Sequence, residues 1–172
     1  FTIRFNPEPA AWIAAQAEAG GWFTARAEWL NAVFSTDSPF AASPWRREKG
    51  GLWDVGPHAL SVLLPILGPA TEVTAARGPA DTVHLVLRHK DGASSTVALT
   101  LTAPPKAAGY TVELRGETGV ETLPPGSRTP VEALGSAADA LLEAARTGEP
   151  HPCDAAFGLR VVAVLSAAER SL

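Results

Sequence analysis

Residues 81–102 read DTVHLVLRHKDGASSTVALTLT, and this stretch decides the fold class. Its two halves alternate apolar and polar residues with the period of a β-strand that has one buried face. Asp91-Gly92 separates the halves, and such a pair favours the positive φ angles of a tight hairpin turn. The apolar residues of both halves should share one face: Val83, Leu85, Leu87, Val97, Leu99 and Leu101. The other face should be polar and rich in threonine: Thr82, His84, Arg88, Ser94, Thr96, Thr100 and Thr102.

Working outward from this hairpin, the same alternation predicts strands at Phe1–Phe5, Trp22–Phe34, Thr71–Arg77, Tyr110–Gly116 and Gly119–Leu123. Within Trp22–Phe34 one face should hold Phe23, Ala25, Ala27, Trp29 and Val33. Helical spacing and end signals predict helices at Glu8–Ala19, Leu52–Leu67, Pro130–Thr147 and Asp154–Leu172. Ser35–Lys49 is polar and reads as a long loop, a kind of segment that is often functional. The prediction is an α+β domain: a mainly antiparallel open sheet with helices packed on one face.

The composition and net charge of the chain argue against several classes of function. The 172 residues carry a net charge of −4 and no basic stripe, which argues against nucleic acid as a partner. The longest apolar run, Leu60–Leu67, is too short to cross a bilayer, so we expect no membrane association. A single cysteine, Cys153, cannot form an internal disulfide, and a cytoplasmic protein is expected. The sequence starts at Phe1 without any methionine, so we expect a piece of a longer protein.

The stretch GGLWDVGPH, residues 50–58, carries the chemistry. Asp54 and His58 stand four residues apart at a helix entrance, which would place their side chains on one face. A carboxylate there can orient an imidazole, and a histidine that titrates near neutrality suits proton transfer in a hydroxyl-to-carbonyl reaction. The glycines would allow a sharp bend and a close approach of a ligand. The structural alternative is that Asp54 only caps the helix and His58 is only a buried, satisfied side chain.

Other polar residues offer weaker candidates. His84, His89 and His151 could in principle join Asp54 and His58 as metal ligands, but their spacing is arbitrary, and no metal site is predicted. Cys153 has no visible His-Asn partners and reads as a structural residue rather than a nucleophile. The sequence also lacks G-x-G-x-x-G and G-x-x-x-x-G-K-[ST], so no cofactor-binding residue is predicted in this chain.

Trp45-Arg46 followed by GGLWDVGPHAL at residues 50–60 resembles a motif of the glucose–fructose oxidoreductase/inositol dehydrogenase/MocA (Gfo/Idh/MocA) family. In that family a W-R pair and a spacer precede G-G-G-x-L-x-D-x-G-x-H and an apolar helix. Leu67-Gly68 and residues 71–75 extend the resemblance into a sheet strand. Residues 4–7 resemble the end of the family's cofactor domain, and residues 154–162 its closing helix. The third glycine is absent, the spacer is short, and the family's E-K-P lysine has no counterpart, since Glu48-Lys49-Gly50 lies elsewhere.

The resemblance implies a dihydrodipicolinate-reductase-like C-terminal domain. Residues 1–20 would be the end of, or linker from, a missing N-terminal Rossmann domain, and residues 21–172 the substrate-binding and oligomerisation domain. NAD or NADP would be bound by the N-terminal domain, and the substrate would be a sugar or polyol. His58 would be the general acid/base with Asp54 as its helper, while Lys49, Arg46 and Trp45 would line the substrate pocket. The open sheet face would form a homo-oligomer, and the isolated chain would be an inactive part of a dehydrogenase. The alternative is a non-catalytic binding or oligomerisation module with the same fold.

Overall fold

The computed structural model describes residues 1–34 and 38–172 as a six-stranded sheet with α-helices on one face. The order of the strands in the sheet is β2-β3-β4-β1-β5-β6. Neighbouring strands run antiparallel except for β1 and β4, which pair in parallel. The strands are β1 (Trp22–Leu30), β2 (Ala70–Arg77), β3 (Val83–His89), β4 (Ser94–Thr100), β5 (Gly109–Gly116) and β6 (Gly119–Thr122). The predicted α+β class with a mainly antiparallel open sheet is confirmed.

The hairpin of β3 and β4 forms as predicted, but positive φ was expected at both Asp91 and Gly92 and occurs only at Gly92 of this pair. Leu85 pairs with Val97 and Val83 with Leu99, and the turn glycine, Gly92, has a φ of 92°. The six predicted inward residues are all buried. On the other face most side chains are exposed, but Thr100 is buried, and its hydroxyl donates to Asp81 of the loop between β2 and β3.

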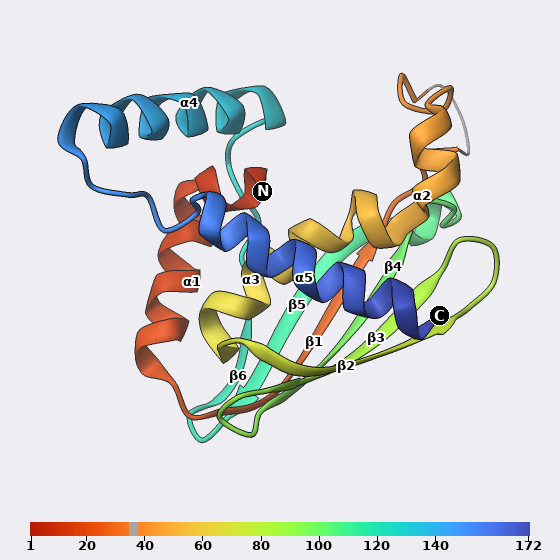
Figure 1. The fold of residues 1–172 in the computed structure, drawn as a ribbon, viewed down its shortest axis with the longest axis horizontal. Coiled ribbons are helices and arrows are strands. Elements are labelled where there is room, and N and C mark those ends of the chain that lie inside the picture. The colour runs from red at the N-terminus through yellow and green to blue at the C-terminus, as the bar shows by residue number, and fades with distance from the viewer. Residues whose placement is uncertain (35–37) are drawn as a thin grey trace.

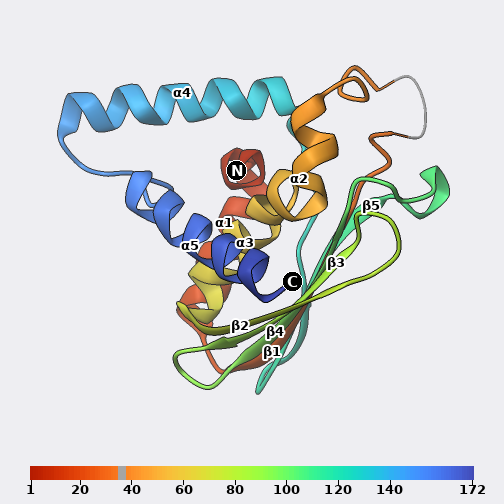
Figure 2. The same cartoon turned by 45° about the vertical axis from the view of Figure 1, so that its right-hand side comes forward.

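Helices cover only one face of this sheet. They are η1 (Thr2–Phe5), α1 (Pro7–Ala19), α2 (Pro44–Asp54), α3 (Gly56–Leu67), η2 (Pro105–Ala107), α4 (Pro130–Thr147) and α5 (Ala155–Ser171). Figures 1 and 2 show α3 and α5 lying on the sheet, with α1 beside them and α4 farther out. The apolar side of α3 is buried between the sheet and α1 and α5, and Leu60 and Leu63 are fully buried. No helix in the described ranges is long and apolar enough to span a membrane.

Two strand predictions need correction. Phe1–Phe5 contains a 3-10 helix, η1, rather than a strand, because no neighbouring strand pairs with it and its backbone closes local turns. Phe23 was expected on the buried face of β1, but it is 64% exposed, whereas Trp22 is buried. The register of β1 against β5 shifts between Trp22 and Thr24, and such a bulge moves one side chain to the opposite face.

The expected loop at Ser35–Lys49 is also partly wrong. Residues 35–37 lie outside the described residues, and α2 begins at Pro44, capped by the side chain of Ser43. The expected single helix Leu52–Leu67 is two helices, because α2 ends at Asp54 and α3 begins at Gly56. Pro57 falls in the first turn of α3, where its missing N–H costs no hydrogen bond.

Candidate functional site

The segment Gly50–His58 is held against the end of β4 by a very close backbone contact. Gly50 adopts φ 60° and ψ −164°, which kinks α2. At Gly51 a Cβ atom would lie 2.7 Å from the Cα and 2.8 Å from the backbone N of Thr100. The predicted sharp bend is therefore present. The close approach at Gly51, however, is that of a strand backbone and not of a ligand.

Asp81 fixes this contact, and the sequence patterns did not identify it. Its Oδ2 accepts hydrogen bonds from the backbone N–H groups of Gly51 and Leu101, both at 2.9 Å. Its Oδ1 accepts from the hydroxyls of Thr100 and Thr102 at 2.5 and 2.6 Å. Burial opposes ionisation, but these four bonds outweigh it and hold the pKa of the Asp81 carboxyl below its usual range. The Asp81 carboxylate thus links the bend at Gly50 and Gly51 to the end of β4 by hydrogen bonds.

Replacing Asp81 tests this role in the folded chain. In Asp81→Asn the amide oxygen can still accept from the two backbone N–H groups, and the amide can donate to the two hydroxyls. We expect a loss of about 1 kcal/mol in the free energy of unfolding, because a charged acceptor is lost. Asp81→Ala leaves two N–H groups without partners and should cost about 2–3 kcal/mol. Urea unfolding of the three proteins measures both values, and equal stability of all three would contradict the assignment.

His58 lies at the start of α3, with its ring against the sheet. The imidazole stacks on Trp29 of β1 with the ring centroids 5.5 Å apart and an interplanar angle of 21°. Trp29 stacks in turn on Tyr110 of β5 at 4.6 Å. Among the described residues, neither ring nitrogen of His58 has a hydrogen-bond partner. Burial and, after it, the positive charge of the amino group at Phe1 lower the pKa of His58 to about 4, and the charge of Asp54 acts in the opposite direction. The imidazole is therefore neutral at pH 7 and has free nitrogens, but its pKa lies below the near-neutral value that the sequence analysis expected.

The pKa of His58 leads to a prediction about stability. Its value of about 4 in the folded state is below the usual 6.5, so between these values the unfolded chain binds more protons. We expect the free energy of unfolding to be highest above about pH 6.5 and to fall by about 3 kcal/mol towards pH 4 because of this group. Denaturant titrations across this range measure the fall. His58→Gln should remove most of it, and an unchanged slope in that variant would contradict the assignment.

Asp54 pairs with Arg46 rather than with His58. The Arg46 Nε lies 3.1 and 3.2 Å from the two carboxylate oxygens of Asp54. The Arg46 guanidinium also lies 4.4 Å from the centre of the Phe40 ring. The expected one-turn spacing of Asp54 and His58 assumed one continuous helix, but the break at Val55 separates α2 from α3. Asp54 is therefore an electrostatic neighbour of His58 and a direct partner of Arg46.

Lys49 and Trp45, the other two residues of α2 that were predicted to bind substrate, lie in surroundings that differ from those of Arg46. The Lys49 Nζ lies 3.7 Å from Glu48 and 3.8 Å from Glu169 of α5. The Trp53 indole donates to the same Glu169 at 3.0 Å, so this carboxylate joins α2 to α5. Trp45 is 47% exposed and, within the described ranges, forms no hydrogen bond or ring contact with the other candidate residues. The structure brings Arg46 and Asp54 together and leaves Lys49 and Trp45 at the surface of α2.

The remaining histidines and Cys153 occupy separate places. His89 is buried, with its ring nitrogens 2.9 Å from the Gly68 carbonyl and the Ser95 hydroxyl. His151 stacks on the Phe5 ring, and His84 is exposed on β3. Over the described ranges, no group of three or more His, Cys, Asp or Glu could hold a metal ion. Burial raises the pKa of the Cys153 thiol, which disfavours the reactive thiolate.

The helix starts of the described chain do not fit the phosphates of a dinucleotide. A phosphate binds at free backbone N–H groups in the first turn of a helix. Each of the four helices α1–α4 has a proline in that turn, which removes a donor. The first turn of α5 is capped by the Asp154 carboxylate, which would repel a phosphate.

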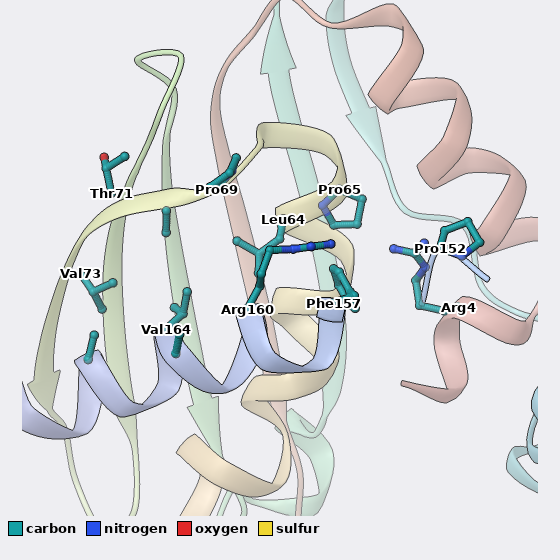
Figure 3. A pocket seen from close by; sticks show the side chains of 13 residues that line it. Arg4, Leu64, Pro65, Pro69, Thr71, Val73, Pro152, Phe157, Arg160 and Val164 are labelled. Carbon is teal, nitrogen blue, oxygen red and sulfur yellow. The ribbon is translucent and has the colours of Figure 1, made fainter. Parts of the chain in front are cut away.

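A cavity of about 610 Å³ lies between α3, β2 and α5. Figure 3 shows the side chains that line it. Its lining is mainly apolar and includes Leu64, Val73 and Phe157. The guanidinium groups of Arg4 and Arg160 lie 5.5 and 5.4 Å from the centre of the Phe157 ring. None of the five candidate site residues lines this cavity, so it is separate from the site around His58.

Comparisons with known proteins place this fold in a family. A family model described as "GFO/IDH/MocA C-terminal domain" matches residues 24–120, more than half of the chain. An NAD binding oxidoreductase from Klebsiella pneumoniae has 19% identity and a TM-score of 0.80, over 99% of this chain and 62% of its own. The comparison with curated proteins finds no match.

Two further solved structures are similar at the same level. Levoglucosan dehydrogenase in complex with NADH and levoglucosan has 19% identity and a TM-score of 0.77, over 99% of this chain and 62% of its own. An oxidoreductase from Agrobacterium radiobacter in complex with NAD+, L-tartaric acid and magnesium has 19% identity and a TM-score of 0.75, over 99% and 60%. This chain therefore spans 60–62% of the length of these structures. The fold, the motif at residues 50–58 and the match over residues 24–120 together show that the chain belongs to the GFO/IDH/MocA family, as its C-terminal domain.

Proposed function

We propose that this chain is the substrate-binding domain of an NAD- or NADP-dependent oxidoreductase that acts on a hydroxyl or carbonyl of a sugar or polyol. In this proposal the nucleotide is bound by a Rossmann domain that precedes residue 1, with residues 1–20 as the junction and residues 21–172 as the substrate and oligomerisation domain. Hydride transfer is the chemistry that the nicotinamide supplies from that domain. The helix starts of the described chain support this assignment, because four of them contain a proline and the fifth is capped by a carboxylate.

The observation that carries the proposal is the environment of His58. Its ring is fixed by stacking on Trp29, and both ring nitrogens are free of partners in the described part of the chain. During oxidation His58 accepts the proton of the substrate hydroxyl, and during reduction the same nitrogen returns a proton to the carbonyl oxygen. The Asp54 carboxylate favours the protonated imidazole and so assists uptake of the proton.

The residues of α2 supply the substrate contacts in this proposal. Arg46 is half-buried and held by Asp54, so its remaining N–H groups can donate to substrate hydroxyls from a fixed position. Lys49 and Trp45 are more exposed and would contact parts of the substrate farther from His58. Polyhydroxylated compounds suit such a set of donors beside an aromatic surface.

The uncovered face of the sheet is the proposed homo-oligomer surface. No α-helix of the described chain lies on it (Figure 2). Phe23 and Val86 are exposed apolar residues of β1 and β3, at 64% and 54%. A large open sheet face is usually covered by another layer. The cytoplasm is the proposed compartment, because the single cysteine cannot form an internal disulfide.

A non-catalytic binding or oligomerisation module is the second candidate. It is favoured by one observation: the Asp54 carboxylate bonds to Arg46 and makes no hydrogen bond to His58. Without a direct carboxylate partner, His58 could be a packing residue on Trp29. The two functions differ in whether removal of the imidazole changes turnover of the full-length protein.

Nucleotide titration tests whether the nucleotide is bound by the preceding domain and not by this chain. NADH and NADPH are titrated into the full-length protein and into the 172-residue chain, and binding is followed by calorimetry. We expect saturable binding of at least one nucleotide by the full-length protein and none by the 172-residue chain. Binding to the shorter chain, or to neither protein, would refute the proposal.

A further inference from the structure

Helix α4 exposes its large apolar side chains instead of burying them. Val131, Leu134, Leu141 and Leu142 have 80%, 64%, 70% and 68% of their surface exposed. At 100° per residue these four side chains form one stripe along the helix. Asp139 and Glu143 lie on a different side, which is polar. A stripe of this kind on an outer helix marks a surface that packs against another structure.

The side of α4 that faces the rest of the chain carries small residues. Ala133 is fully buried, and Ala137, Ala140 and Ala144 are half-buried. A helix covering its own core alone would turn its leucines inward and its alanines outward. The helix itself is well specified, because Thr129 and Glu132 form a capping box at its start. The outward leucines are therefore a property of the sequence rather than of a poorly formed helix.

The start of α4 packs against the first residues of the described chain and is joined to them by hydrogen bonds. The helix packs mainly against η1. Arg128, just before the helix, donates from its guanidinium to the Phe5 carbonyl at 3.1 Å and from its backbone N–H to the Asn6 side chain at 2.7 Å. Ser127 donates its backbone N–H to Glu8 at 3.2 Å. Any chain that precedes residue 1 therefore emerges beside α4.

We propose that the stripe Val131, Leu134, Leu141 and Leu142 is the surface on which the preceding nucleotide-binding domain docks. This inference rests on the proposed function, which places that domain before residue 1. The matched structures are long enough to contain it, since this chain covers only 60–62% of each. Docking here would bury the four side chains and place the partner domain next to the junction at η1.

The location of α4 favours this occupant over a second copy of the chain. Figure 2 shows α4 on the helical side of the molecule, with η1, α1 and α5 between it and the sheet. The proposed homo-oligomer uses the opposite face of the sheet, so it leaves the α4 stripe uncovered. The preceding domain is held beside the stripe by its own covalent connection, which raises its effective concentration there.

The test compares two double variants in two lengths of protein. Leu134→Ser/Leu141→Ser removes the stripe, and Asp139→Ser/Glu143→Ser is the matched control on the polar side of α4. In the 172-residue chain we expect neither variant to shift the thermal midpoint by more than about 2 °C, because all four side chains are exposed. In the full-length protein the leucine variant should lower the midpoint by at least about 5 °C or split one unfolding transition into two, and the control should do neither.

Each other outcome overturns the inference. Identical melting of both full-length variants would show that no domain packs on the stripe. A dimer of the 172-residue chain that the leucine variant abolishes, seen by sedimentation, would assign the stripe to a second copy. NADH or NADPH titration of the full-length protein separates this failure from that of the proposed function. Intact nucleotide binding together with unchanged melting would refute only the proposed docking surface. Absent nucleotide binding would refute the proposed function.

Discussion

His58→Ala in the full-length protein is expected to lower kcat by about 10²- to 10⁴-fold, the contribution typical of a positioned general acid or base. The reason is that the free imidazole nitrogens at the start of α3 are the proposed proton carrier, and alanine cannot replace them. The loss corresponds to about 3–5 kcal/mol of transition-state stabilisation. Initial rates of NADH or NADPH formation with a saturating polyol substrate measure it. KM should change much less than kcat, because the substrate contacts on α2 remain.

His84→Ala is the matched control for that experiment. His84 lies exposed on β3 and is not one of the five candidate site residues, and its loss should leave kcat within about twofold. The circular dichroism and thermal midpoint of both variants establish that they are folded. A folded His58→Ala protein with an unchanged kcat would favour the non-catalytic module instead.

Gly51→Ala is expected to lower the free energy of unfolding by about 3 kcal/mol or more, because overpacking against rigid atoms is costly. The added Cβ would stand 2.7 Å from the Cα and 2.8 Å from the backbone N of Thr100, and neither atom can swing aside as a side chain can. To accommodate it, α2 must move off the end of β4 and loosen its hydrogen bond to Asp81. Urea unfolding of the 172-residue chain measures the loss.

Gly135→Ala provides the control for this glycine. Gly135 lies inside α4, and a Cβ there would meet no atom within 4 Å. Alanine should therefore raise stability by about 0.5–1 kcal/mol, as it does in exposed helix interiors. If both substitutions stabilise the chain, the close contact of Gly51 with β4 does not exist in solution.

The sequence predicts an element well where a local pattern and its end signals agree. The β3–β4 hairpin has period-two alternation and the Asp91-Gly92 turn, and α4 has its capping box and a closing Gly148. Prediction failed where a short pattern stood alone. Five alternating residues at Phe1–Phe5 cannot form a strand without a neighbour to pair with, and the bulge beside Phe23 depends on the register against β5.

The sequence motif correctly located the segment of the candidate site, but it did not identify the residues that bond to this segment. Residues 50–58 do place His58 at a helix start, as expected. The partner of Asp54 was missed, because the helical spacing assumed no break at Val55, and Arg46 eight residues earlier was treated as a separate candidate. Asp81 had no local signal, since its bonds to Gly51 and Leu101 join residues thirty and twenty positions away. Such contacts depend on the packing of α2 on β4.

The most direct test of the central claim is the rate of NADH or NADPH formation with a panel of sugars and polyols. It compares the full-length protein with the 172-residue chain at equal concentration. We expect turnover of at least one substrate by the full-length protein and none by the 172-residue chain, because in our proposal this chain supplies the proton carrier and the preceding domain binds the hydride acceptor. Turnover by the shorter chain alone, or a full-length protein that binds the nucleotide but oxidises none of the panel, would contradict the account.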